Sequence, residues 1–176
     1  MAGVITALRF QKRNARRVNV YLDGHYAFSL AAVDAARLKH GQVLTDEEIA
    51  RLRAADEVQT AYEQALRFLR YRPRSQTEIR RHLGKKGVSD SVIAAVMERL
   101  IERGYVDDLE FARFWVRERE TFRPRSPYAL RHELRMRGVD DAIISQVLAE
   151  LDPEDSAYRA ALSKVRRWRD LDYQTF

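Results

Sequence analysis

An internal repeat limits what this chain can fold into more than any other feature of its sequence. When the sequence is slid against itself by 51 residues, Arg72-Pro73-Arg74-Ser75 falls on Arg123-Pro124-Arg125-Ser126. The alignment continues without a gap, with Arg80 on Arg131, Leu83 on Leu134, Gly87-Val88 on Gly138-Val139, Asp90 on Asp141, Val96 on Val147 and Leu100 on Leu151. Self-similarity at a fixed spacing is typical of proteins built from stacked units of one design. The sequence therefore predicts two similar units in tandem.

Each unit is predicted to contain three helices, because residues that end and begin helices recur at fixed places within it. A proline disfavours helix in the residue before it, serine followed three residues later by glutamate forms a capping box, and glycine adopts the left-handed conformation that closes a helix. In the first unit these residues are Pro73, Ser75 with Glu78, Gly87 and Gly104, and the first helix covers 57–71. In the second unit they are Asp107 or Asp108, Ser126 with Pro127, and Gly138.

Apolar side chains at helical spacing predict which faces of these helices are buried. The second helix of the first unit directs Ile79 and Leu83 inward. The third helices are predicted to bury Val92, Ile93, Val96, Met97, Leu100 and Ile101 in the first unit, and Ile143, Ile144, Val147, Leu148 and Leu151 in the second. Aromatic residues recur on the first helices, namely Tyr62, Phe68, Tyr71, Phe111, Phe114, Trp115 and Phe122. We expect core packing for them in preference to base stacking.

The N-terminal region has the two-residue period of strands instead. Val18, Val20 and Leu22 alternate with Arg17, Asn19 and Tyr21, and Tyr26, Phe28 and Leu30 alternate after Asp23-Gly24. Asp-Gly between alternating segments is a strong hairpin signal. A third strand over 4–10, a basic loop over 12–16, and short helices over 31–39 and 45–55 complete the prediction, the last of them capped by Thr45 with Glu48.

The predicted fold is therefore mainly α, with tandem three-helix repeats in a quasi-linear array after a small β-hairpin or meander. The predicted domains are 1–56 for the meander and two short helices, 57–106 for the first repeat, 107–152 for the second, and 153–176 for the first helix of an incomplete third. The helices that would complete the third repeat are absent. We expect that the sequence was shortened or that the natural chain continues past Phe176.

Composition argues against an enzyme and favours a protein that acts by binding. The sequence contains no cysteine, which excludes disulfides, thiolate nucleophiles and Cys-based metal sites. Its four histidines, His25, His40, His82 and His132, lie in different predicted elements without metal-ligand spacing. The acidic pairs Asp107-Asp108 and Asp140-Asp141 stand at helix starts, where capping explains them. We predict no catalytic residues, no metal and no cofactor, and, without an apolar run of 18 residues or a signal peptide, a cytoplasmic protein outside the membrane.

Basic residues are the candidate binding groups. Lys and Arg number 32 against 26 Asp and Glu, and the net charge of +6 suggests a polyanionic partner. They recur around the second helix of both units, as Arg72, Arg74, Arg80, Arg81, Lys85 and Lys86, and as Arg123, Arg125, Arg131, Arg135 and Arg137. With Ile79 and Leu83 inward, we predict that these side chains project outward and form a stripe along the array. The alternative is a set of solvated helix faces, where arginine in a last turn also complements the helix dipole.

A further basic cluster lies on the predicted hairpin. It consists of Arg9, Lys12, Arg13, Arg16 and Arg17. We give equal weight to binding by this cluster and to protection of an edge strand against aggregation.

Three stretches resemble the RecX family, whose members regulate the RecA recombinase. They are Tyr71-Arg72-Pro73-Arg74-Ser75 with the helix that follows it to Lys86-Gly87, Arg103-Gly104-Tyr105-Val106-Asp107-Asp108, and Val18-Asn19-Val20-Tyr21-Leu22-Asp23-Gly24, which resembles the N-terminal extension of longer members. Their combination in this order is specific, and the resemblance covers nearly the whole chain.

The resemblance implies an elongated, curved array that lies in the helical groove of a RecA filament on DNA and touches successive protomers. It also implies inhibition of strand exchange, of ATP hydrolysis and of repressor cleavage stimulated by the filament, by blocking filament growth or promoting disassembly. DNA repair, homologous recombination and the SOS response would be modulated accordingly. The chain departs from the family in its incomplete third module, so fewer modules would span fewer protomers and the inhibition would be weaker.

Two rival functions are open, one implied by the resemblance and one suggested by the basic residues and the helical repeats. The expected partners are the RecA filament and single- or double-stranded DNA within it, bound by a monomer, and the stripe faces either acidic protein or phosphate. Whether the chain caps filament ends or coats the groove is open. A direct DNA-binding helix-turn-helix array, acting in transcription or DNA architecture, would need polar base-reading side chains. The predicted third helices are mostly apolar, which counts against that alternative.

Overall fold

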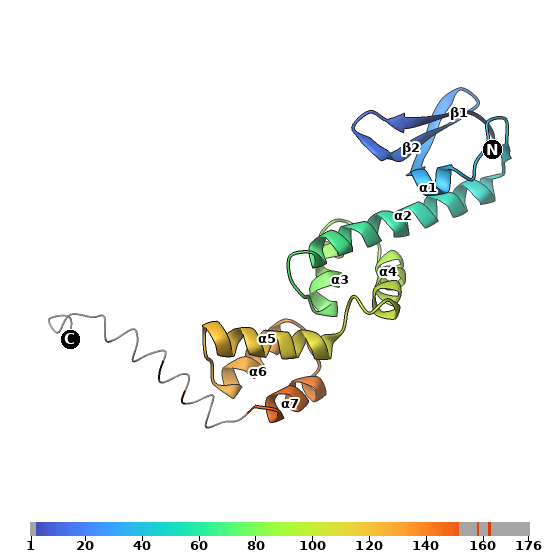
Figure 1. The fold of residues 1–176 in the computed structure, drawn as a ribbon. Helices are drawn as coiled ribbons and strands as arrows, with labels where there is room; N and C mark the ends of the chain where they lie inside the picture. The colour runs from blue at the N-terminus through green and yellow to red at the C-terminus, as the bar shows by residue number, and fades with distance from the viewer. Residues whose placement is uncertain (1–2, 152–157, 159–161, 163–176) are drawn as a thin grey trace. The chain divides into compact units, whose positions relative to one another are not determined.

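The computed structural model describes residues 3–151, 158 and 162, and Figure 1 shows its helices and strands. The predicted helix over 153–176 lies outside the described residues except at positions 158 and 162. The chain divides into two compact units, residues 1–64 with 89–96 and residues 65–88 with 97–176. The elongated, curved arrangement of the whole chain stays a prediction.

The N-terminal segment folds into a four-stranded antiparallel sheet. Its strands are β1 (Gly3–Gln11), β2 (Asn14–Leu22), β3 (His25–Ala31) and β4 (Val43–Leu44), in the spatial order β3-β2-β1-β4. Asp23 and Gly24 have φ angles of 48° and 85°, as a type I′ hairpin requires. The predicted meander is confirmed, and β4 is an addition to it. The predicted loop over 12–16 is wrong, because two residues suffice for an antiparallel connection and β2 begins at Asn14.

One face of the sheet carries the core of the first unit. It packs against α1 (Ala32–Ala35) and the first turns of α2 (Asp46–Leu69), which passes beside the sheet in Figure 1. The buried residues of this core are Ile5, Val18, Val20, Phe28, Leu30, Ala35 and Leu44. The predicted capping box of α2 is present, with Thr45 N donating to Glu48 Oε2 at 2.8 Å and Glu48 N to Thr45 Oγ1 at 3.2 Å.

Helix α2 runs through the position where two separate helices were predicted. The expected end near Ala55 is wrong, because Asp56 lies inside the helix and is buried. Its carboxylate accepts hydrogen bonds from Arg17 Nη1 at 2.7 Å, Arg17 Nη2 at 2.9 Å and Ala31 N at 3.0 Å. These donors satisfy a charge that would otherwise be costly to bury, and they hold α2 to the sheet.

The predicted tandem three-helix repeats are confirmed. In the first repeat α3 (Gln76–Gly84) and α4 (Asp90–Glu102) follow the end of α2, and the second repeat consists of α5 (Asp108–Phe122), α6 (Pro127–Met136) and α7 (Asp141–Ala149). The described chain is therefore mostly helical.

Helix starts in the repeats agree with the predicted caps. Ser75 forms a full capping box with Glu78 at the start of α3, and Ser126 caps α6 with Pro127 at its first turn. Asp107 caps α5 by accepting from Leu109 N and Glu110 N, and Asp140 caps α7 by accepting from Ala142 N. Local pairing of side chain and backbone thus determines these boundaries.

The core of the second repeat contains most of the predicted apolar residues. Phe111, Ala112, Trp115, Val116, Leu130, Leu134, Val139, Ile144 and Val147 are buried in it, with Leu109, Ile143, Leu148 and Leu151 packed against them. In the first repeat the predicted burial of Ile101 is wrong, because that side chain is 45% exposed at the last turn of α4. Core packing is also wrong for Tyr71 and Phe122, which are 84% and 73% exposed.

Candidate functional site

The predicted basic stripe separates into exposed and half-buried side chains. Ile79 and Leu83 are fully buried, as expected, so α3 has the predicted inward face. Arg80, Arg81, Lys85, Lys86, Arg123, Arg125 and Arg135 are exposed, and Arg72, Arg74, Arg131 and Arg137 are half-buried. The expectation that all of these side chains project outward is therefore wrong for the second group.

A single carboxylate holds two of the half-buried arginines. Glu78 Oε1 accepts from Arg72 Nη2 at 2.9 Å and from Arg137 Nη1 at 2.9 Å, and Arg72 Nη1 reaches Glu78 Oε2 at 3.3 Å. The Arg137 guanidinium also lies over the ring of Trp115, with its carbon 3.5 Å from the ring centroid. We call Arg72, Glu78, Trp115 and Arg137 the Glu78 cluster. It joins the start of α3 to the end of α6.

Charge pairing outweighs burial at the Glu78 carboxylate. Burial would raise the pKa of Glu78, but hydrogen bonds from Arg72 and the charges of Arg72 and Arg137 lower it below its usual value. Burial lowers the pKa of Arg137, which Glu78 partly offsets. The cluster is thus an ion-paired network of half-buried charges, so that its arginines are poorly placed to bind a partner.

A second ion-paired cluster lies within the second repeat. Glu133 Oε2 accepts from Arg119 Nε at 2.7 Å and from Trp115 Nε1 at 2.8 Å, while Arg125 Nε lies 3.9 Å from Glu133 Oε1. Burial would raise the pKa of Glu133, but the bonds from Arg119 and Trp115 and the charges of Arg119 and Arg125 lower it. Position 129, which corresponds to Glu78 in the repeat, is alanine. Because the second repeat lacks a carboxylate at that position, arginines at equivalent positions of the two repeats pair with different acidic residues.

Backbone-directed hydrogen bonds strengthen the connection between α3 and the second repeat. The buried Ser75 hydroxyl donates to Arg137 O at 2.6 Å, and Thr77 Oγ1 donates to Gly138 O at 3.2 Å. Gln76 N donates to Asp108 Oδ1 at 2.8 Å. The sequence marked Asp108 as a possible cap of α5, whereas its carboxylate instead binds the start of α3. Burial raises the pKa of Asp108, and this backbone donor lowers it.

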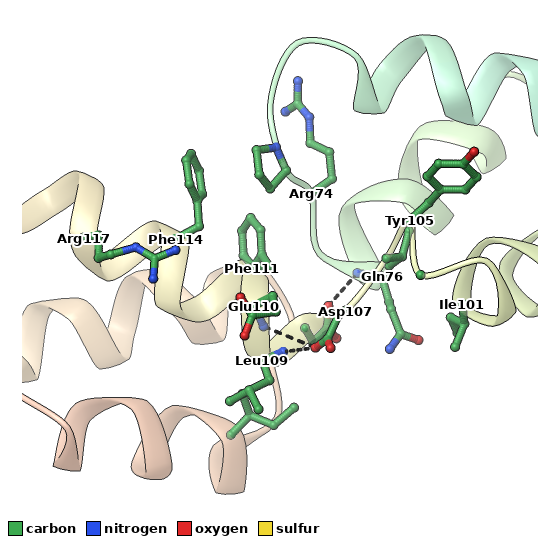
Figure 2. A pocket seen from close by; sticks show the side chains of 15 residues that line it. Arg74, Gln76, Ile101, Tyr105, Asp107, Leu109, Glu110, Phe111, Phe114 and Arg117 are labelled. Atoms are coloured by element: carbon green, nitrogen blue, oxygen red, sulfur yellow. Dashed lines mark hydrogen bonds between the residues drawn. The ribbon is translucent and has the colours of Figure 1, made fainter.

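A pocket of about 640 Å³ opens beside this connection, and Figure 2 shows its lining side chains. Ile101, Tyr105, Leu109 and Phe114 contribute apolar surface, and charged groups, among them Arg117, lie at its border. Ile101 and Tyr105 are 45% and 53% exposed. The lining of the pocket is therefore of mixed apolar and charged character.

Basic side chains create a positive electrostatic potential at His82 of α3. His82 is half-buried and stacks on Phe68, with ring centroids 4.0 Å apart. Burial lowers the pKa of His82 below its ordinary value of 6.5, and the charges of Lys86, Arg74 and Lys85 lower it further. Arg74 itself lies over the Phe68 ring, 3.9 Å from its centroid.

The lowered pKa of His82 predicts that acid weakens the fold. As the pH falls below 6.5, His82 takes up a proton in the unfolded chain before it does so in the folded chain. The free energy of unfolding therefore decreases until the pH has fallen through the folded pKa. Urea unfolding at about pH 8 and pH 5.5 would measure this loss. His82→Phe, which retains an aromatic ring, should lose less stability on acidification than the wild type. Equal losses would show that His82 is not linked to folding.

The predicted patch on the hairpin is smaller than expected. Arg9, Lys12, Arg13 and Arg16 are exposed. Arg17 does not belong with them, because Asp56 of α2 holds its guanidinium in an ion pair at 2.7 Å. The sequence indicated this pair only weakly, through the position of Asp56 on the helical face of Ile49 and Leu52.

Comparison with known proteins gives one consistent result. Sequence models of the RecX N-terminal domain, first three-helix domain and second three-helix domain match residues 3–45, 61–100 and 107–148. Regulatory protein RecX of Bacillus subtilis is 39% identical over 165 residues, which cover 93% of this chain and 62% of that protein. Regulatory protein RecX of Geobacillus kaustophilus is 37% identical over 175 residues, which cover 95% of this chain and 65% of that protein.

Solved structures agree with this result. A crystal structure of regulatory protein RecX matches with a TM-score of 0.75 and 29% identity, over 98% of this chain and 87% of that one. RecX from Lactobacillus salivarius, at 22% identity and a TM-score of 0.58 over 68% of this chain and 80% of that one, supports the fold alone. The chain spans about three fifths of the length of the curated relatives. Within the described residues, every helix is too short or too polar to cross a membrane. Because its N-terminal domain and both three-helix domains match in order, the chain belongs to the RecX family of regulatory proteins.

Proposed function

We propose that this chain binds the RecA filament on DNA and restrains strand exchange, ATP hydrolysis and filament-stimulated repressor cleavage. The observation that carries the proposal is the exposed cationic surface of α3 in a member of the RecX family. Arg80, Arg81, Lys85 and Lys86 are exposed there. Burial lowers the pKa of His82, and the charges of Lys86 and Lys85 lower it further. The chain would act by binding, as a cytoplasmic monomer without a catalytic step or cofactor, and would modulate DNA repair and the SOS response.

Ion pairing within the molecule changes which side chains of the stripe are expected to bind the filament. Arg72 and Arg137 are ion-paired with Glu78, and a charge already paired in this way has little to gain from a second partner. Arg123, Arg125 and Arg135 are exposed in the second repeat, where Arg135 pairs with Asp141 at 2.7 Å. The proposed contacts therefore centre on α3 and the loop before α6, and the hairpin cations form a secondary surface.

Charge reversal on α3 tests the proposal. Arg80→Glu with Lys86→Glu should weaken binding to the filament about tenfold or more, because attraction to acidic protein or phosphate becomes repulsion. Filament binding and inhibition of ATP hydrolysis at fixed salt would measure the effect. Arg37→Glu with Lys39→Glu changes the net charge equally at exposed positions outside the repeats and should bind nearly as the wild type does. Equal weakening by both pairs would contradict a localised site.

The rival function, direct DNA binding by a helix-turn-helix array, makes a different prediction. It requires tight binding to bare duplex, whereas the proposed regulator requires recombinase on the DNA. Helix α4 buries Val92, Ile93, Val96, Met97 and Leu100. That apolar face leaves few side chains for reading bases. Binding to duplex with and without recombinase separates the two functions, and each phosphate contact on duplex would steepen log K against log salt by about 0.9.

A further inference from the structure

Two highly exposed aromatic side chains occupy the same position in both three-helix repeats. Tyr71 and Phe122 correspond at the repeat offset of 51 residues and directly precede the two Arg-Pro-Arg-Ser segments. They are 84% and 73% exposed. The sequence predicts core packing for both, so their position on the surface is a result of the tertiary structure.

Other aromatic residues of the same helices have rings that contact neighbouring side chains. Phe68, one turn before Tyr71, stacks on His82 and lies under Arg74. Trp115, two turns before Phe122, is buried and carries the Arg137 guanidinium on its ring. Among the described residues, no contact of this kind explains why the aromatic position before each Arg-Pro-Arg-Ser segment recurs.

Exposed arginines stand close to both aromatic positions in the sequence. They are Arg67 and Arg70 before Tyr71, and Arg123 and Arg125 after Phe122. Exposed aromatic residues accompanied by arginine have the composition of an interface hot spot, where Tyr, Trp and Arg contribute most of the binding energy. The chemistry that fits is an apolar pocket bordered by carboxylates.

The spacing favours a protein over a nucleic-acid strand. Successive nucleotides lie about 3.4 Å apart along a strand, whereas a helix is roughly 10 Å across, and Tyr71 and Phe122 are separated by a complete set of three helices. Features that recur at that scale match protein subunits.

We infer that Tyr71 and Phe122 are equivalent anchors, each inserting into the same apolar, acid-bordered pocket on successive copies of one protein subunit. The inference rests on the proposed function, which makes those copies RecA protomers. It adds to that function the two side chains that would contact successive, regularly spaced protomers of the filament. Because both anchors belong to one chain, the second engages at a high effective concentration once the first is bound.

Alanine variants of the 176-residue chain test the inference. Tyr71→Ala and Phe122→Ala should each weaken binding to filament assembled on single-stranded DNA by about tenfold or more, and the double variant by at least the product of the single effects. Tyr71→Phe and Phe122→Tyr should bind as the wild type does. Since both rings are exposed, thermal unfolding should be unchanged in all of these variants.

Tyr128→Ala is the matched control. Tyr128 is 85% exposed, but its counterpart in the first repeat is Thr77. Binding by this variant should equal that of the wild type. If the anchor variants bind as tightly as the Tyr128 variant, or if Tyr128→Ala weakens binding as much as they do, the inference is overturned while the proposed function stands.

Two further outcomes are decisive. Equal loss of binding to bare single-stranded DNA and to filament would assign the rings to base stacking and overturn the protein pocket. A wild-type chain that does not bind filament at all would overturn the proposed function, and this inference with it.

Discussion

Gly138→Ala is expected to destabilise the chain by about 3 kcal/mol, the sum of backbone strain and a steric clash. Gly138 has a φ angle of 73°, in the left-handed region that side chains with a Cβ atom disfavour. An added Cβ would lie 2.3 Å from Thr77 Oγ1 and 2.5 Å from Thr77 Cβ. Because Thr77 Cβ is attached directly to the backbone of α3, the clash cannot be relieved by a rotamer change. The start of α3 would have to move away from the end of α6.

The repeat supplies a matched control for this prediction. Gly87 corresponds to Gly138 and has a φ angle of 79°, but within the described chain an added Cβ there would meet no heavy atom within 4 Å. Gly87→Ala should therefore lower the free energy of unfolding only by the backbone strain, about 1 kcal/mol. Urea unfolding of both variants measures the difference.

A double-mutant cycle separates strain from the clash at Gly138. Thr77→Gly removes the atoms that the new Cβ would meet, so combining it with Gly138→Ala should cost less than the two single changes added together. Additive effects, or equal costs for Gly87→Ala and Gly138→Ala, would refute the close approach of α3 to residue 138.

Glu78→Ala is expected to destabilise the chain by about 2–3 kcal/mol, mainly by leaving two half-buried guanidinium groups side by side without their counter-charge. The side chains of Arg72 and Arg137 are 29% and 27% exposed, and that of Glu78 is 14% exposed. Solvent can screen the arginines in part, so the expected cost is below that of fully buried charges. The substitution also removes the glutamate of the capping box at the start of α3, which adds to the free-energy cost.

The pH dependence of this effect has a definite sign. Because the folded pKa of Glu78 is lowered, its stabilising contribution is present above the pKa of the unfolded chain and is lost as the pH falls through the folded pKa. Glu78→Ala should therefore lower the free energy of urea unfolding at neutral pH and approach the wild type in acid. Glu98→Ala, at an exposed position of α4, should change it by less than about 0.5 kcal/mol. A Glu78 variant as stable as that control would show that the ion pairs contribute little.

Local features of the fold could be read from the sequence because short-range interactions determine them. The Ser75 and Ser126 caps, the Asp23-Gly24 hairpin and the inward face of α3 each depend on residues within a few positions of one another. The break predicted in α2 failed for the opposite reason. Asp56 looks like a helix end by itself, and its helical position depends on Arg17, 39 residues away in the chain.

The candidate site was less predictable, because the fate of a charged side chain depends on its distant neighbours. Arg72 and Arg123 are equivalent in the repeat, yet Arg72 is paired with Glu78 and Arg123 is exposed. Nothing near Arg72 in sequence indicates Arg137 as its neighbour in the Glu78 cluster. Sequence reasoning therefore identified the basic positions as a group and could not sort those that bind within the molecule from those that face solvent.

By itself, the sequence determined the repeated three-helix design, the caps of the helices in the repeats and the family, since each depends on residue types at short, regular spacing. The tertiary structure decided which arginines are held in ion pairs, which glycine must lack a side chain, and that Tyr71 and Phe122 face solvent. Those outcomes depend on atoms brought within a few ångströms by folding, as Arg137 and Glu78 are across 59 positions of the chain. Identical residues in the two repeats acquire different roles because their surroundings in space differ.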